Sequence, residues 1–279
     1  QLISTRGAVD NIDLPNLAIE SVPGDSGGII SAAVRQSYIG VAVFGPRVGG
    51  YSTSGDIRLD FFHGFPAAND GLSSPGVRLR TMQIAFDGER TSIRAGQETP
   101  FFSPLSPNSL AATAYPPLSA SGNLWAWSPQ IYVERRIARG EHHTLALRGG
   151  MLDALTGELP AGEYSRLPTA GERSRMPALA GRASWRVEHD GRDATAGAGV
   201  YYSRHNWGYN RNVNAWAATG DVAAPGGAEW LGFGRLGGEA RRGQRGRCRS
   251  GRRGVVGASS PWWGGAERAA RTLPLREAR

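Results

Sequence analysis

Apolar and polar residues alternate along much of the chain up to about residue 225. In the segment 55–62, GDIRLDFF, isoleucine, leucine and phenylalanine occupy alternate positions, with aspartate and arginine between them. Successive side chains of a β-strand point to opposite faces, so this period of two predicts strands with one apolar and one polar face. The same pattern is found in SYIGVAVFG (37–45), SPQIYVERRI (128–137), HTLALRG (143–149), LAGRASWRVEHD (179–190) and TAGAGVYYSRHNW (195–207).

The segment 76–97, GVRLRTMQIAFDGERTSIRAGQ, predicts a complete hairpin. Its alternation slips near Thr81 and Met82, which is typical of a β-bulge. Asp87 and Gly88 are a turn signal, after which a second strand returns. Sustained helical periodicity is found nowhere before residue 225, so the sequence predicts an all-β protein made of antiparallel hairpins.

The polar face of these strands repeatedly carries arginine and carboxylate, whereas the apolar face carries mostly alanine, valine, leucine and isoleucine. An arginine facing lipid would cost roughly 2–4 kcal/mol at the bilayer midplane, and the alternation avoids this cost. We therefore expect a transmembrane β-barrel of porin type, closed or left incomplete by this chain, with a water-filled interior. A soluble β-sandwich or open sheet is the alternative. The expected pore-lining residues are Asp56, Arg58, Asp60, Arg78, Arg80, Arg94, Glu98, Glu134, Arg182 and Arg186.

The segment from about 98 to 124 breaks the alternation and contains five prolines. Structureless segments of this length are uncommon in compact domains and are usually functional or disordered. Its apolar residues suit a loop that packs against another surface. We expect it to fold into the mouth of the barrel as a constriction loop, with Phe101, Phe102, Leu105 and Tyr115 as its contact residues.

The order of motifs over residues 35–127 resembles the outer-membrane porins of Gram-negative bacteria, particularly the DcaP-like group. The resemblance rests on RQSYIGVAVFGP, GGYSTSGDIRLDFFHGFP and GVRLRTMQIAFDGERTSIRAGQETPFFSPLSP. It implies a closed antiparallel barrel, a homotrimer in many members, an inward-folded loop after Gly96 and Gln97, and passive diffusion of small solutes. This chain departs from the family in having no recognisable signal peptide at its start and no terminal strand that ends in an aromatic residue.

Composition divides the 279 residues at about position 234. Residues 1–234 carry 20 arginines against 21 acidic residues, whereas residues 235–279 carry 12 arginines against three glutamates, so the net charge of +8 belongs to the second part. This Arg/Gly-rich tail is expected to be disordered and outside the fold. Its composition is typical of GC-rich DNA translated out of frame. The alternative is an arginine-rich arm that binds phosphate backbones. We favour the first interpretation and expect no nucleic-acid partner.

The segment PGDSGG, residues 23–28, matches the signature around the nucleophile of trypsin-like serine proteases, which would make Ser26 catalytic. That chemistry needs a histidine base and an acid, which in this family precede the serine. No histidine precedes Ser26, and the first one, His63, follows it. A flexible turn before a strand explains the motif better, and we expect no enzyme activity.

Metal and cofactor chemistry is poorly supported. His142 and His143 are neighbours and would point to opposite faces of a strand. The acidic residues of EHDGRDA (188–194) read first as a hairpin turn rather than a calcium site. The single cysteine excludes a cysteine cluster. No run of apolar residues is long enough for a transmembrane helix.

The sequence therefore predicts a passive outer-membrane channel for small hydrophilic solutes, in contact with outer-membrane lipid and without metal or cofactor. The porin resemblance adds a homotrimer as the candidate assembly. Trp207, Tyr209 and Trp216 lie in the polar segment RHNWGYNRNVNAW and fit an aromatic girdle at the membrane interface. The same residues would suit a soluble β-rich carbohydrate-binding protein, which is the second hypothesis.

Overall fold

The computed structural model describes thirteen β-strands and one four-residue helix. Among the residues described, the protein is therefore all-β, as the alternation predicts. The described residues are 2–9, 19–20, 28–32, 34, 37–62, 76–106, 124, 126–158, 167–189, 192–209, 211–224, 228–231 and 235–242. The strands are β1 (Leu2–Thr5), β2 (Ile29–Ala32), β3 (Tyr38–Val48), β4 (Tyr51–Asp60), β5 (Arg78–Asp87), β6 (Thr91–Glu98), β7 (Ser128–Ala138), β8 (His143–Leu152), β9 (Ala178–His189), β10 (Arg192–Asn206), β11 (Arg211–Ala224), β12 (Ala228–Leu231) and β13 (Arg235–Arg242), and the helix is α1 (Ala170–Arg173).

Strands β3 to β11 form an antiparallel meander in which each strand pairs with its neighbours in the chain. Sequential hairpins need only short-range connections, which is why local alternation and turn signals predict them well. Strands β1 and β2 pair separately in a two-stranded sheet. The predicted bulge is confirmed. Arg58 and Leu59 of β4 pair with Thr81 and Leu79 of β5, which leaves Arg80 as the extra residue.

Strands β12 and β13 both pair with β11, one after the other along the same edge. Strand β12 pairs with residues 221–224 and β13 with residues 211–218, both antiparallel to β11. Together they follow almost the whole length of β11 as one interrupted strand. The sheet thus extends into the segment that composition separates at position 234; residues 243–279 lie outside the described residues.

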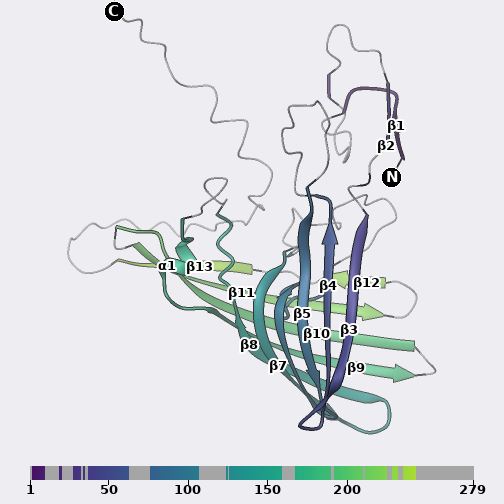
Figure 1. The fold of residues 1–279 in the computed structure, drawn as a ribbon. Helices are drawn as coiled ribbons and strands as arrows, with labels where there is room; N and C mark the ends of the chain where they lie inside the picture. The colour runs from purple at the N-terminus through teal and green to yellow at the C-terminus, as the bar shows by residue number, and fades with distance from the viewer. Residues whose placement is uncertain are drawn as a thin grey trace, which may run out of the picture.

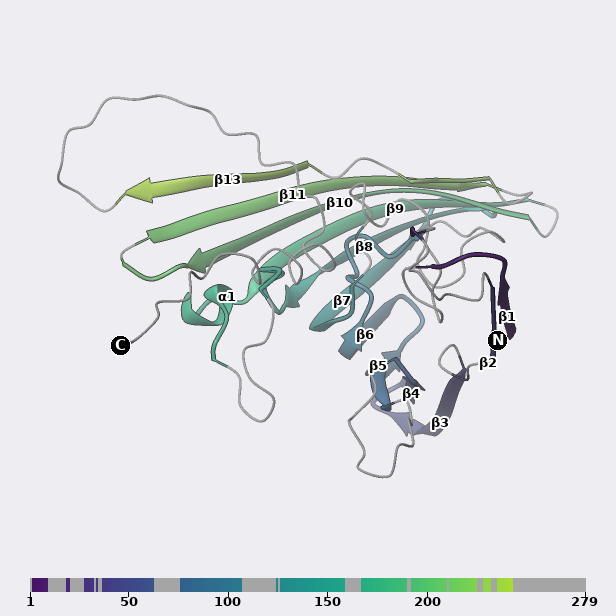
Figure 2. The same cartoon turned by 90° about the horizontal axis from the view of Figure 1, so that it is seen from above.

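The large sheet is strongly twisted and curved. Strands β3, β4 and β5 stand upright in Figure 1, whereas β9 and β10 run across the picture. Seen from above, β3 and β13 lie far apart at the two ends of the curve (Figure 2). No pairing joins these two edges, so the described strands form an open sheet. The closed barrel that the porin resemblance implies is not found among them.

The connections differ between the two ends of the sheet. At one end the connections have two to four residues: 49–50, 88–90, 139–142 and 190–191. At the other end three connections are long, namely 61–77, 99–127 and 153–177, and the connection 207–210 is short. The sheet therefore has one end with short connections and one end with long connections. Helix α1 lies in one of the long connections. Within the described ranges, no helix has the length and apolar character needed to cross a membrane.

Seven buried residues form a small apolar cluster on a single face of the sheet, at the end with long connections. Phe101 and Phe102, just beyond β6, pack there against Tyr201 of β10 and Ala217 of β11. Leu152, Ala154 and Ala178 complete the buried part of the cluster. A chain segment that follows β6 thus covers strands that are distant in sequence.

Candidate functional site: the charged face of the sheet

The pairing register places nine of the ten predicted pore-lining residues on one face of the sheet, and Arg80, at the bulge, reaches the same face beside Asp60. Asp60 lies opposite Arg78, Arg94 lies opposite Tyr132, and Glu134 lies opposite Arg148. Arg148 in turn lies opposite Arg182. Directly paired residues share a face, so this arrangement extends without interruption from β4 to β9. We call this surface the charged face.

The other face is apolar, and its large side chains are exposed. We call it the apolar face. Over the central strands it presents Ile39, Val41, Val43, Leu79, Met82, Ile84, Phe86, Ile131, Val133, Leu147, Met151, Leu179, Trp185, Val200, Tyr202, Trp216 and Val222, each at least 37% exposed. A continuous exposed apolar surface of this extent marks a contact with lipid or with another protein.

Asp60 is the centre of the first ionic group on the charged face. Its carboxylate is fully buried and accepts hydrogen bonds from Arg78 Nε at 2.9 Å and Nη2 at 2.6 Å. Arg80, at the bulge, approaches the same carboxylate at 3.9 Å. Both guanidinium groups lie over the ring of Trp127, at 5.2 Å and 4.8 Å from its centroid. Two arginines are therefore held by one buried acid and one aromatic ring.

The middle of the charged face carries further pairs in which each charge has a partner. Glu134 accepts a hydrogen bond from Arg148 Nε at 2.6 Å and lies 3.7 Å from Arg136. Asp56 accepts one from Gln83 at 2.7 Å. Pairing of this kind lowers the cost of placing charges on a partly sheltered surface. Arg58 and Arg186 share the face but have exposed side chains.

The deepest ion pair joins Arg182 of β9 to Asp221 of β11, across the intervening strand β10. The distances are 2.5 Å from Nη1 to Oδ2 and 2.6 Å from Nη2 to Oδ1, and both side chains are at most 5% exposed. Gly197 and Gly199 of β10 lie between them in register. A Cβ atom on Gly197 would overlap the Arg182 guanidinium, so the absence of a side chain there is what lets the arginine cross β10.

The segment 99–103, which we call the covering segment, lies against the charged face. The backbone N–H of Phe101 donates to Gln130 Oε1 at 3.0 Å, and Gln130 Nε2 donates to the carbonyl of Thr99 at 2.8 Å. The Phe101 ring stacks on Tyr132, with centroids 4.7 Å apart, and the Phe102 ring stacks on Tyr201 at 5.2 Å. Of the predicted contact residues, Phe101 and Phe102 are buried, Leu105 is half-buried, and Tyr115 lies outside the described residues.

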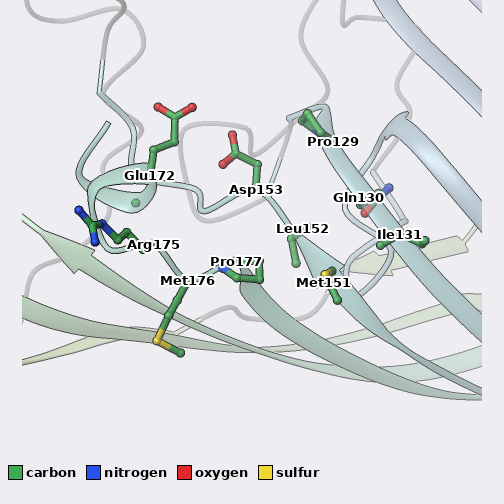
Figure 3. Close-up of a pocket in the computed structure, with 11 residues that line it drawn as sticks. Pro129, Gln130, Ile131, Met151, Leu152, Asp153, Glu172, Arg175, Met176 and Pro177 are labelled. Atoms are coloured by element: carbon green, nitrogen blue, oxygen red, sulfur yellow. The ribbon is translucent and has the colours of Figure 1, made fainter. Parts of the chain in front are cut away.

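A pocket of about 440 Å³ lies where β7 and β8 meet α1 and the residues just before β9. Ile131, Met151 and Met176 supply apolar walls, whereas Asp153 and Glu172 project their carboxylates away from the sheet (Figure 3). Helix α1 is fixed there by a capping box between Thr169 and Glu172. The pocket is a wide, shallow hollow beside the covering segment, with mixed chemistry and no convergent set of reactive groups.

Other candidate chemistry finds little support in the described residues. Ser26 and His63 lie outside them. His143 faces the ring of Trp185, with centroids 5.6 Å apart. Ser203 and His205 share a hydrogen bond of 2.8 Å on β10, but both are buried, which is typical of a structural pair. No group of three metal-ligating side chains is found in the part of the chain that the structure describes.

Arg148, Asp221 and Gln130 are among the polar residues of the charged face that the sequence did not single out. Each occupies a polar position of an alternating strand, and that position was the only available signal. Their partners are Glu134, Arg182 and the backbone of the covering segment. Such partners become visible only when the strand register is known.

Comparisons with protein-family models, with curated proteins and with solved structures found no match for this chain.

Proposed function

We propose that this chain forms the wall of an outer-membrane, porin-like channel through which small hydrophilic solutes diffuse passively. The observation that carries the proposal is the separation of the two faces over nine consecutive strands. Charged and amide side chains lie on the charged face, and exposed apolar side chains cover the apolar face. Lipid beyond the apolar face and water along the charged face would satisfy both surfaces.

Strand length and connections also support this proposal. The strands from β3 to β11 have between 8 and 15 residues, and a tilted strand needs about 9–11 residues to cross the hydrocarbon core. Membrane β-barrels have short turns at one end and longer loops at the other. The connections of this sheet are divided in the same way between its two ends.

In the proposed channel, the paired charges of the charged face create a transverse field along the passage. Solutes would be selected by size and by how well they replace the hydration of these groups. The covering segment narrows the space beside β7 and β10. No step in this mechanism requires a cofactor or a metal ion, and a homotrimer stays a prediction.

A second candidate is a soluble β-rich carbohydrate-binding protein. Tyr202 and Trp216 are directly paired on the apolar face, and the Tyr202 hydroxyl donates to Asn214 Oδ1 at 3.2 Å. An exposed aromatic pair beside an amide is suited to stacking on a sugar ring. The same pair, in the halves of β10 and β11 nearest the connection between them, also fits the interfacial position of aromatic residues in a membrane protein.

Reconstitution separates the two candidates. Protein refolded in detergent is added to planar lipid bilayers and to liposomes. The channel proposal expects stepwise conductance and liposome association that resists carbonate extraction. A protein that stays monodisperse in buffer without detergent and produces no conductance would overturn it and favour the soluble candidate, which is then tested by binding to immobilised polysaccharides.

A further inference from the structure

We propose that Arg182 and Asp221 form an anchor that fixes the covering segment on the charged face and so sets how far this segment projects into the passage. The anchoring itself is a property of the fold. Its effect on the passage rests on the proposed function. Arg182 and Asp221 are positioning residues in this proposal, because they act through the backbone of Phe102.

The contact between the anchor and the covering segment is a single carbonyl group. The carbonyl oxygen of Phe102 accepts a hydrogen bond from Arg182 Nη1 at 3.3 Å and another from Thr219 Oγ1 at 3.0 Å. The two donors come from different strands, β9 and β11. An acceptor held from two strands is fixed along and across the sheet, which a single hydrogen bond would not achieve.

Asp221 determines the direction in which Arg182 donates. Both carboxylate oxygens are occupied by the guanidinium group in a two-point pairing. Such pairing fixes the plane of the guanidinium as well as its position. Nη1, which contacts Asp221, is the same atom that reaches the Phe102 carbonyl, so the carboxylate and the carbonyl oxygen share one donor group.

The glycines of β10 make this geometry possible. A Cβ atom on Gly199 would overlap the Phe102 carbonyl oxygen and would also crowd Thr219 Oγ1. One on Gly197 would overlap the guanidinium of Arg182. Gly197 and Gly199 therefore leave a trough on the charged face of β10. The Arg182 side chain lies over Gly197, and the Phe102 carbonyl lies over Gly199.

The anchor complements a second attachment at the start of the covering segment. There Gln130 of β7 bonds to the backbone of both Thr99 and Phe101. The ring contacts of Phe101 and Phe102 with Tyr132 and Tyr201 are not directional in the same way, because stacked rings can slide. Loss of the anchor would leave the segment attached at Gln130. At Phe102 it would be held only by the Thr219 hydrogen bond and the ring contact with Tyr201, so it would open there more readily.

The test measures chymotrypsin cleavage after Phe101 and Phe102 in the refolded full chain, with the fragments identified by mass. Asp221→Asn keeps the side-chain shape but removes the charge that orients Arg182. Asp60→Asn is the matched control, because Asp60 is also a buried carboxylate and its hydrogen bonds come from Arg78 and Phe62, not from the covering segment. We expect cleavage in Asp221→Asn to rise roughly tenfold or more above that in Asp60→Asn.

A second pair of variants tests the anchor without removing a charge. Gly199→Ala pushes directly on the Phe102 carbonyl, whereas Gly149→Ala places a methyl group where nothing lies within 4 Å. We expect faster cleavage in Gly199→Ala only. If neither Asp221→Asn nor Gly199→Ala differs from its control, the anchor proposal is wrong.

Single-channel conductance of the same variants tests the effect on the passage. A changed conductance in Asp221→Asn, together with faster cleavage, supports the full proposal. Faster cleavage with unchanged conductance overturns the part that concerns the passage. If no variant conducts, including the unaltered chain, the proposed function fails while the cleavage result still decides the anchor.

Discussion

Asp60 and Arg78 face each other across β4 and β5, and both oxygens of the Asp60 carboxylate are bonded to the guanidinium, at 2.9 Å and 2.6 Å. The carboxylate is fully buried, whereas 32% of the arginine side chain is exposed. The acid therefore depends on this pairing more than the base does. It also accepts a hydrogen bond from the backbone N–H of Phe62, which links the pair to the end of β4.

Asp60→Ala should reduce the free energy of unfolding by roughly 3 kcal/mol, because it leaves Arg78 and the Phe62 N–H without their shared acceptor. Urea unfolding of the refolded protein, followed by tryptophan fluorescence, measures the change. Glu89→Ala is the control: its ion pair with Arg90 is long and highly exposed, so we expect a change within about 0.5 kcal/mol. Equal effects in the two variants would contradict the structural importance of Asp60.

Val133→Arg tests whether the apolar face meets lipid. Val133 is 45% exposed, so an arginine fits there sterically and would be tolerated in water. In a bilayer it would cost roughly 2–4 kcal/mol near the midplane. We expect the variant to insert into liposomes far less efficiently, while Val133→Leu inserts normally. Insertion of Val133→Arg at the level of the unaltered chain would exclude lipid at this position.

Gly149 and Gly150 are adjacent on β8 and point to opposite faces. A Cβ on Gly150 would overlap the backbone and side chain of β7 at Tyr132, whereas one on Gly149 would meet nothing within 4 Å. Gly150→Ala should therefore destabilise the protein by about 1–3 kcal/mol. Gly149→Ala should be neutral or slightly stabilising, because alanine restricts the unfolded chain more than glycine does. Urea unfolding of both variants checks the difference, and a reversed order would mean that the β7–β8 packing is not as described.

Phe102→Ala should lower the free energy of unfolding by roughly 3–5 kcal/mol, because the ring is fully buried against Tyr201. Leu167→Ala is the control, since Leu167 lies in a connection of the same end of the sheet and is 74% exposed. Thermal unfolding monitored by circular dichroism compares them. A small loss in Phe102→Ala would show that the covering segment contributes little to stability.

Local patterns were enough to predict most of the large sheet. The period of two identified β3, β4, β7, β9 and β10, because the face of a strand residue depends only on its position in the strand. Residues 87 and 88 were correctly predicted as a hairpin turn, and the slip at Thr81 as a bulge. Meander topology then follows, since each strand pairs with the next in sequence.

The same patterns could not predict the contacts that organise the charged face. Arg182 and Asp221 are 39 residues apart and meet only because β9 and β11 flank β10 in the observed register. The trough at Gly197 and Gly199 is likewise invisible in a sequence that is rich in glycine throughout. Predicting which polar residues pair requires the register of three strands at once.

Near residue 234, composition predicted the limit of the sheet less well than alternation predicted its strands. An arginine- and glycine-rich segment lacks the apolar content to fold alone, which led to the expected boundary at 234. Strand β13 nevertheless pairs with β11 over residues 235–242. Backbone hydrogen bonds to an existing edge do not depend on side-chain hydrophobicity, so composition could not exclude this pairing.

The interrupted strand made of β12 and β13 also fixes the polarity of the sheet at its outer limits. Strands β3 and β11 run in the same direction, because an even number of reversals separates them. The added strand reverses the direction once more, so the two borders of the sheet are oppositely oriented. Joining one border to the other, within a chain or between neighbouring chains, would therefore continue the up-and-down order without requiring a single parallel pair.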